Sequence, residues 1–285
     1  MKDILVFLDL SKMDKVLLRY TLHLRNKFRI GKICLVHFVQ IQELGNLNEY
    51  FDLEDQSLDE IIEEEIRSKA EKDGLESDDY EVQLFLKGGF DAMLEWINES
   101  DYDICLLGKK IIHGGTGAFP GKLVRLTKKS VLMITESTRL NLETLLIPVD
   151  FSDYSKKALD FAGQLTPREI DFKLIAINVF RVPQTYFPYL GEWDQKHIEK
   201  MRSGRQKKLK EFISDVDFSR DTPETEVAYG EKSISDTIYN YAVSNFVDLI
   251  ILSVKGKNNA SNLQIGTVPY QLIQPQKEVA VLLVR

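Results

Sequence analysis

Short runs of apolar and β-branched residues alternate with longer amphipathic segments along the whole chain. This alternation is typical of βαβ units, in which helices join parallel strands. The strand-like runs are apolar almost without interruption, as expected where helices cover both faces of a sheet. The pattern predicts strands near residues 4–9, 33–39, 81–86, 103–108, 131–135, 144–149, 173–180, 224–229, 247–253 and 279–284. It predicts helices near 13–28, 57–73, 90–100, 119–128, 153–165, 194–214, 233–245 and 267–274.

The two halves of the chain repeat one another. Asp9 and Asp150 each follow an apolar run and are followed by one apolar residue and a serine, and the two aspartates lie 141 positions apart. The apolar runs 34–39 and 175–180 keep the same separation. A repeat at constant separation indicates a duplicated domain. We therefore predict two doubly wound, Rossmann-like α/β domains, each with a five-stranded parallel sheet, over residues 1–138 and 142–285.

The composition indicates a globular protein and argues against several functional classes. The 285 residues include 44% hydrophobic and 28% charged residues, which is typical of globular proteins, and no apolar run approaches the ~20 residues of a membrane helix. Asp9 interrupts the apolar N-terminal run before a signal peptide could form, so we expect a cytoplasmic protein. A net charge of −7 argues against a broad nucleic-acid-binding surface. The four histidines show no metal-ligand spacing, and no catalytic constellation is readable.

The aspartates that end the first strand of each half are candidate ligand-binding residues. In open α/β sheets, ligands bind beyond the carboxyl ends of the strands, where the strand order reverses. Asp9 and Asp150 would lie at this crevice and could accept hydrogen bonds from a ribose or a base. Each could equally cap the following helix. Capping is the better interpretation for Ser11 and Ser152.

A second candidate segment follows the fourth strand of the second half. Ser253 ends an apolar run and is followed by Gly256, and after nine further residues Gly266 and Thr267 open a helix. Glycines let a backbone approach an anion closely, and N–H groups at a helix start attract negative charge. The segment therefore predicts a phosphate-binding loop, with the Thr267 hydroxyl as an additional donor.

With these motifs, the chain resembles the universal stress protein family in a tandem two-domain form, and the resemblance covers essentially the whole sequence. It implies a fold like that of the adenine nucleotide alpha hydrolases. In nucleotide-binding members, an aspartate after the first strand contacts the adenosine, a residue on the second strand touches the adenine, and a Gly-x2-Gly-x9-Gly-(Ser/Thr) loop wraps the phosphates. The resemblance assigns these roles to Asp150, Val179, Ser253, Gly256, Gly266 and Thr267, with Ser253 in place of the first glycine.

The first half departs further from the family pattern. Its corresponding residues are Asp9, Phe38, Gly108 and Gly117. Only eight residues separate Gly108 from Gly117, and Ala118 lacks the hydroxyl that Thr267 supplies. We therefore expect a degenerate second site, with ATP, with or without Mg²⁺, bound in the second domain only.

The resemblance implies a nucleotide-binding stress-response protein with a regulatory or protective role and at most weak ATPase activity. It also implies that the halves form a pseudo-dimer through edge strands 131–134 and 279–282. Association of two chains and the identity of a protein partner are left open. The alternative is an interaction module in which both sites are degenerate and the domains dock a protein or a small apolar ligand. An adenylating or pyrophosphatase enzyme is disfavoured, since residues 10–13 and 151–154 contain no glycine for a phosphate loop after the first strand.

Overall fold

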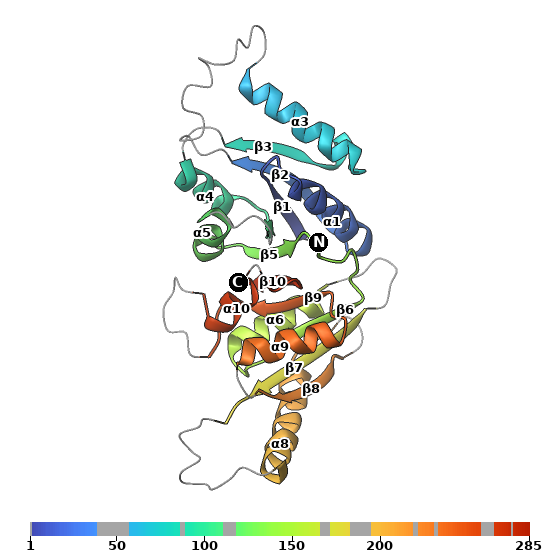
Figure 1. Ribbon diagram of the computed structural model, residues 1–285, viewed down its shortest axis with the longest axis vertical. Coiled ribbons are helices and arrows are strands. Elements are labelled where there is room, and N and C mark those ends of the chain that lie inside the picture. The colour runs from blue at the N-terminus through green and yellow to red at the C-terminus, as the bar shows by residue number, and fades with distance from the viewer. Residues whose placement is uncertain are drawn as a thin grey trace. The chain divides into compact units, whose positions relative to one another are not determined.

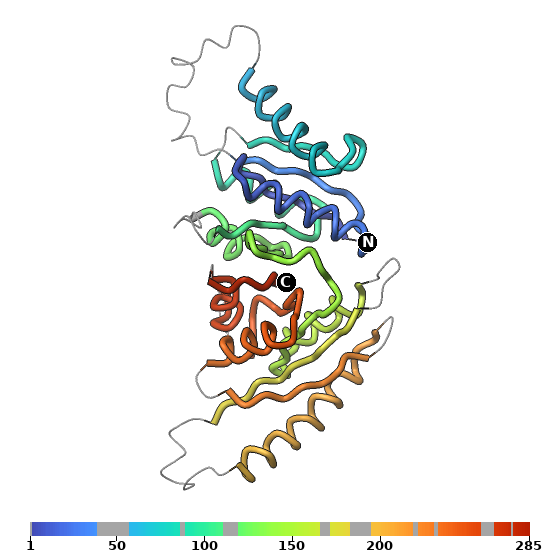
Figure 2. The backbone as a smooth tube through the Cα atoms, turned by 45° about the vertical axis from the view of Figure 1, so that its right-hand side comes forward, coloured from blue at the N-terminus to red at the C-terminus, as the bar shows by residue number. Residues whose placement is uncertain are grey.

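The computed structural model of the chain describes residues 2–38, 57–85, 89–110, 118–165, 172–182, 195–218, 222–230, 233–257, 265–274 and 276–285. The chain divides into two compact units, Met1–Leu140 and Asn141–Arg285. Both units alternate strands with helices, as the colour sequence in Figures 1 and 2 shows. No helix in the described part of the chain has both the length and the apolar character of a membrane span.

The first unit is a five-stranded parallel sheet in the order β3-β2-β1-β4-β5. Right-handed crossovers place α1 and α3 on one face and α4 and α5 on the other, and Figure 1 shows these pairs apart. Its elements are β1 (Lys2–Leu8), α1 (Met13–Lys27), β2 (Ile30–Phe38), α3 (Leu58–Lys72), the 3₁₀ turn η2 (Ser77–Asp79), β3 (Glu81–Phe85), α4 (Gly89–Glu99), β4 (Ile104–Lys109), α5 (Ala118–Leu126) and β5 (Ser130–Thr135).

The second unit repeats this topology, with the parallel order β8-β7-β6-β9-β10. Its elements are β6 (Thr144–Pro148), α6 (Asp153–Gly163), β7 (Lys173–Phe180), α8 (Gln195–Ser214), β8 (Glu224–Tyr229), α9 (Ile234–Ser244), β9 (Leu249–Ser253), α10 (Thr267–Leu272) and β10 (Ala280–Val284). In each unit the strand order reverses between the first and fourth strands. The predicted fold class is confirmed, and the predicted elements agree with the structure to within a few residues at their ends.

The central strands carry the core of each unit because both of their faces are covered. Leu5 and Val6 on β1, and Leu145 and Leu146 on β6, are all 0% exposed. Burial of apolar side chains at ~25 cal/mol per Å² is the main force that holds such a sheet to its helices. The first strand of each unit therefore fixes the position of the residues that follow its carboxyl end.

The repeat extends to backbone and hydrogen-bond detail. Leu10 and Phe151 have φ values of 60° and 62°, a left-handed conformation that non-glycine residues seldom adopt. The His37 ring Nδ1 lies 2.9 Å from the Leu8 carbonyl oxygen, and Asn178 Nδ2 donates to the Val149 carbonyl at 2.6 Å. The same turn and the same contact between the first two strands are therefore built twice with different side chains.

The helix caps differ between the halves. Ser152 caps α6, because its hydroxyl oxygen accepts a hydrogen bond from the Ser155 N–H. Ser11 also satisfies an N–H group at the helix start, because its hydroxyl oxygen accepts from the Met13 N–H, but the N-cap position of α1 is Lys12, which makes no side-chain cap bond. In the first half the buried Asp14 carboxylate instead accepts from the Asp9 N–H at 3.0 Å.

Candidate functional site

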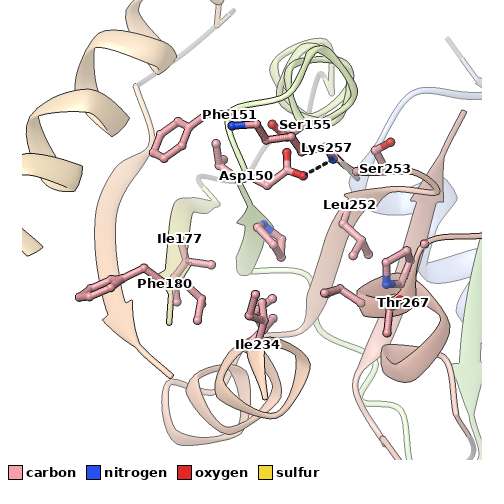
Figure 3. Close-up of a pocket in the computed structure, with 18 of the residues that line it drawn as sticks. Asp150, Phe151, Ser155, Ile177, Phe180, Ile234, Leu252, Ser253, Lys257 and Thr267 are labelled. Carbon is pink, nitrogen blue, oxygen red and sulfur yellow. Dashed lines mark hydrogen bonds between the residues drawn. The ribbon is translucent and has the colours of Figure 1, made fainter. Parts of the chain in front are cut away.

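A cavity of about 1110 Å³ opens at the carboxyl ends of the strands of the second unit (Figure 3). Its walls come from the ends of β6, β7 and β9, from α8 and α9, and from the start of α10. Ligand pockets commonly measure about 300–1,000 Å³, so this space suffices for a nucleotide. All of the residues assigned to the second-half site line it: Asp150, Val179, Ser253, Gly256, Gly266 and Thr267.

The Asp150 carboxylate is held by hydrogen bonds from two loops. Oδ1 accepts from the N–H and hydroxyl groups of Ser152, and Oδ2 accepts from the Lys257 N–H at 2.8 Å. Burial alone would raise the pKa of Asp150, but the hydrogen bonds from Ser152 and Lys257 outweigh it, and the pKa is lowered. Asp150 is therefore a fixed, ionised acceptor at neutral pH.

Gly256 allows the β9 loop to approach Asp150. A Cβ atom at position 256 would lie 2.8 Å from Oδ2 of Asp150, closer than real Cβ contacts. The absence of a side chain thus lets the adjacent Lys257 N–H reach the carboxylate. Asp150 belongs to the motif that repeats after 141 positions, and Gly256 belongs to the glycine-containing loop, so the two sequence motifs meet at this contact.

The floor of the cavity is apolar and its rim carries hydroxyl groups. Ile177, Ile234 and Leu252 lie between Phe180 on one side and Thr267 on the other in Figure 3. The Ser253 side chain is 8% exposed, at the end of β9. An apolar floor with a few polar groups suits a planar base joined to a sugar and phosphates.

Gly266 does not offer the free donor that the sequence suggests. Its N–H donates to the Val254 carbonyl oxygen at 2.8 Å, and its φ of −66° is accessible to any residue. Pro269 in the first turn of α10 has no N–H, which further reduces the number of free donors at this helix start. The Gly266 N–H therefore already has a partner, and the Thr267 hydroxyl is the clearer donor on this side.

Basic side chains that the sequence analysis did not single out also line the cavity. They are Arg181 after β7, Arg205 and Lys208 on α8, and Lys255 and Lys257 after β9. Lys208 Nζ lies 4.5 Å from the centre of the Phe151 ring. Asp150 is the single acidic residue among the described lining residues. The cavity is therefore suited to an anion.

In the first unit, the residues that correspond to the cavity lining take part in an ion pair and in contacts between aromatic rings. Lys110 Nζ lies 2.5 Å from Oδ2 of Asp9, so the carboxylate already has a cation as partner. Burial raises the pKa of Asp9, but the bonds from Lys110 and Ser11 lower it by more. Gly108 is covered by the Met13 side chain, whose Cγ would lie 2.5 Å from an added Cβ.

Four phenylalanines of the first unit pack against one another. The Phe38 ring stacks on Phe119 with centroids 5.4 Å apart, and Phe119 lies 5.8 Å from Phe7 and 5.9 Å from Phe90. Phe38 corresponds to Val179, so the aromatic cluster includes the counterpart of a residue that lines the cavity of the second unit. Gly117, the remaining predicted residue of this site, lies outside the described residues. No group of three or more potential metal ligands occurs within the described ranges.

Comparison with known proteins gives the family. The model of the universal stress protein family matches residues 141–285, which is the second unit. The chain belongs to the universal stress protein family, a family of stress-response proteins. No curated protein sequence matches it significantly.

Solved structures support the tandem fold of the whole chain. A universal stress protein from Archaeoglobus fulgidus DSM 4304 is 16% identical, over 99% of this chain and 98% of its own, with a TM-score of 0.63. A protein of unknown function from Pseudomonas aeruginosa PAO1 is 12% identical, over 100% of this chain and 92% of its own, with a TM-score of 0.62. At these identities the likeness establishes the fold alone.

Proposed function

We propose that the second unit binds ATP and that the protein acts as a nucleotide-responsive stress protein without dedicated catalysis. One observation carries the proposal: residues from two separate motifs converge on a basic cavity of about 1110 Å³, whereas in the first unit Phe38, the counterpart of Val179, packs among other phenylalanines. The asymmetry argues that the cavity has been retained for a ligand.

The residues suggest an orientation for the nucleotide. Asp150 is an ionised acceptor suited to a ribose hydroxyl, and Val179 and Ile177 offer an apolar surface for the base. Lys255, Lys257 and the Thr267 hydroxyl are suited to the phosphate chain, because charge-assisted hydrogen bonds to phosphate are stronger than neutral ones. The nucleoside would then face β7 and α8, and the phosphates would face the β9 loop and α10.

Binding would act through stability or through partner contacts. A ligand that binds only the folded state stabilises it by about 2.7 kcal/mol at a concentration of 100 times Kd. ATP would thus stabilise the folded second unit.

The test is a thermal shift of the full chain with ATP and Mg²⁺, together with extraction of nucleotide from the freshly purified protein. We expect a rise in melting temperature that grows with ATP concentration, and no rise with adenosine plus free phosphate. An unchanged melting temperature and no extracted nucleotide would support the alternative, an interaction module with two degenerate sites.

A further inference from the structure

Helix α8 directs an arginine toward the interior at a position where an apolar residue is expected. Arg205, Leu209 and Ile213 share one helix face at spacings of four, and Leu209 and Ile213 are 0% and 1% exposed. Arg205 lies 19 residues before Glu224, the first residue of β8, and Ile62 lies 19 residues before Glu81, the first residue of β3. Ile62 is 8% exposed and packs in the core of the first unit. The second unit therefore has a cation where its repeat has an isoleucine.

The guanidinium of Arg205 is fixed in place by two neighbours. Nη1 donates to Oδ1 of Asn178 at 3.1 Å, and the group lies 5.1 Å from the centre of the Phe180 ring. Asn178 is itself held, because its Nδ2 donates to the Val149 carbonyl. Among the described residues no carboxylate forms an ion pair with Arg205. Burial lowers the pKa of Arg205, but an arginine stays charged in proteins.

The surroundings of Arg205 form a basic end of the cavity that is separate from the phosphate loop. Arg181 follows Phe180, and Lys208 lies over the Phe151 ring. Figure 3 shows Phe151 and Phe180 on one side of the cavity and Thr267 on the other, with Ile177, Ile234 and Leu252 between them. The only described acidic residue of the lining, Asp150, already accepts hydrogen bonds from Ser152 and Lys257. Positive charge thus stands at both ends of an apolar floor.

We propose that Arg205, with Arg181 and Lys208, forms a second anion subsite that binds a phosphate group on the ribose of a purine nucleotide already held by its 5′-phosphates. A guanidinium group can bind two phosphate oxygens at once, and the contacts of Arg205 with Asn178 and Phe180 already limit the freedom that binding would otherwise remove. The inference rests on the proposed function, because the orientation of the nucleoside toward β7 and α8 brings the ribose to this end.

The experiment compares three probes by titration calorimetry on the full chain: AMP, adenosine 3′,5′-bisphosphate and adenosine 2′,5′-bisphosphate. At least one bisphosphate is expected to bind about ten- to a hundredfold more tightly than AMP, as a charge-assisted hydrogen bond would provide. Arg205→Leu removes this gain, so both bisphosphates are expected to bind the variant no more tightly than AMP does. Arg205→Lys keeps the positive charge but lacks the paired N–H donors of the guanidinium group, so it is expected to retain part of the tighter binding of the bisphosphate.

Lys210→Leu is the matched control, since Lys210 is an exposed residue of the same helix and does not line the cavity. It is expected to retain the full gain, and circular dichroism confirms that each variant is folded. The inference is overturned if AMP and both bisphosphates bind equally to the wild type, or if Arg205→Leu keeps the gain. If neither AMP nor ATP binds, the proposed function is itself wrong, and the proposed anion subsite is then wrong as well.

Discussion

Gly256 and Asp150, 106 positions apart in the sequence, are in such close approach that a Cβ atom on Gly256 would lie 2.8 Å from the Asp150 carboxylate. The contact joins the loop after β9 to the turn after β6. These two strands are neighbours in the sheet, and the strand order reverses between them. The position of the carboxylate in the cavity therefore depends on the lack of a side chain at 256.

Gly256→Ala should displace Asp150 and weaken ATP binding by about tenfold or more, because the loss of a single charge-assisted hydrogen bond has about this effect. Titration calorimetry measures the loss. Gly204→Ala is the control: an added Cβ meets nothing within 4 Å there, and the change should stabilise α8 by up to about 1 kcal/mol without altering affinity. Equal affinity of Gly256→Ala and wild type would show that the contact does not position Asp150.

Gly266→Asp should abolish detectable nucleotide binding while the unit stays folded. The backbone at Gly266 is accessible to other residues, and the added Cβ meets Pro269 Cγ at a tight but adjustable 3.3 Å. The variant places a negative charge beside Thr267, where the phosphates are proposed to lie. The matched change in the first half, Gly117→Asp, should leave the affinity unchanged. Equal losses in the two variants, measured by calorimetry, would contradict the asymmetry between the halves.

Phe119→Ala should destabilise the first unit by about 2–3 kcal/mol, less than truncation of a fully buried phenylalanine, because Phe119 is partly exposed but contacts three other rings. Urea denaturation followed by tryptophan fluorescence reports the loss, since Trp96 belongs to this unit. Leu126→Ala, an exposed position on the same helix, should change stability little. ATP affinity should be unaffected by either variant. A Phe119→Ala protein of wild-type stability would show that the aromatic cluster contributes nothing to the core.

The buried Lys109 makes the stability of the first unit depend on pH. Its side chain is 0% exposed, its counterpart in the repeat is Val254, and burial lowers the pKa of Lys109 to about 7. The unfolded chain, with a lysine pKa near 10.4, binds this proton more tightly. The free energy of unfolding should therefore rise with pH between about 7 and 10, and the burial penalty is fully present below pH 7.

Lys109→Val should consequently be more stable than the wild type at pH 6, with the difference shrinking toward pH 10. Urea titrations at the two pH values measure it, and exchange of the exposed Lys207 for valine serves as the control. A difference that stays constant from pH 6 to pH 10 would show that Lys109 keeps an ordinary pKa in the folded protein.

The fold could be predicted well from the sequence because the patterns that indicate it are local and occur in both halves of the chain. Apolar runs and helical periodicity locate the strands and helices, and the constant 141-position separation reveals the duplication. The six residues assigned to the second-half site meet in one cavity, although their roles stay predictions. Pairing of the halves through residues 131–134 and 279–282 likewise stays a prediction.

The missed residues depend on long-range packing. From the sequence alone, Arg205 looks like part of the basic, solvent-exposed surface of its helix. Its inward position becomes clear only because it shares a helix face with the buried Leu209 and Ile213 and corresponds to the buried Ile62 of the first half. The aromatic cluster of the first unit joins residues of four separate elements, and no sequence motif predicts it: Phe7, Phe38, Phe90 and Phe119. The N–H of Gly266 donates to the Val254 carbonyl oxygen, a hydrogen bond that only the folded loop creates and that the sequence does not indicate.

The most direct test of the central claim, one nucleotide site formed by the second unit, is the stoichiometry of ATP binding to the full chain by titration calorimetry with Mg²⁺. The account predicts about one ATP per chain, loss of binding in Asp150→Asn, and unchanged binding in the matched Asp9→Asn variant. Two sites per chain, no site at all, or a loss in Asp9→Asn equal to that in Asp150→Asn would contradict it.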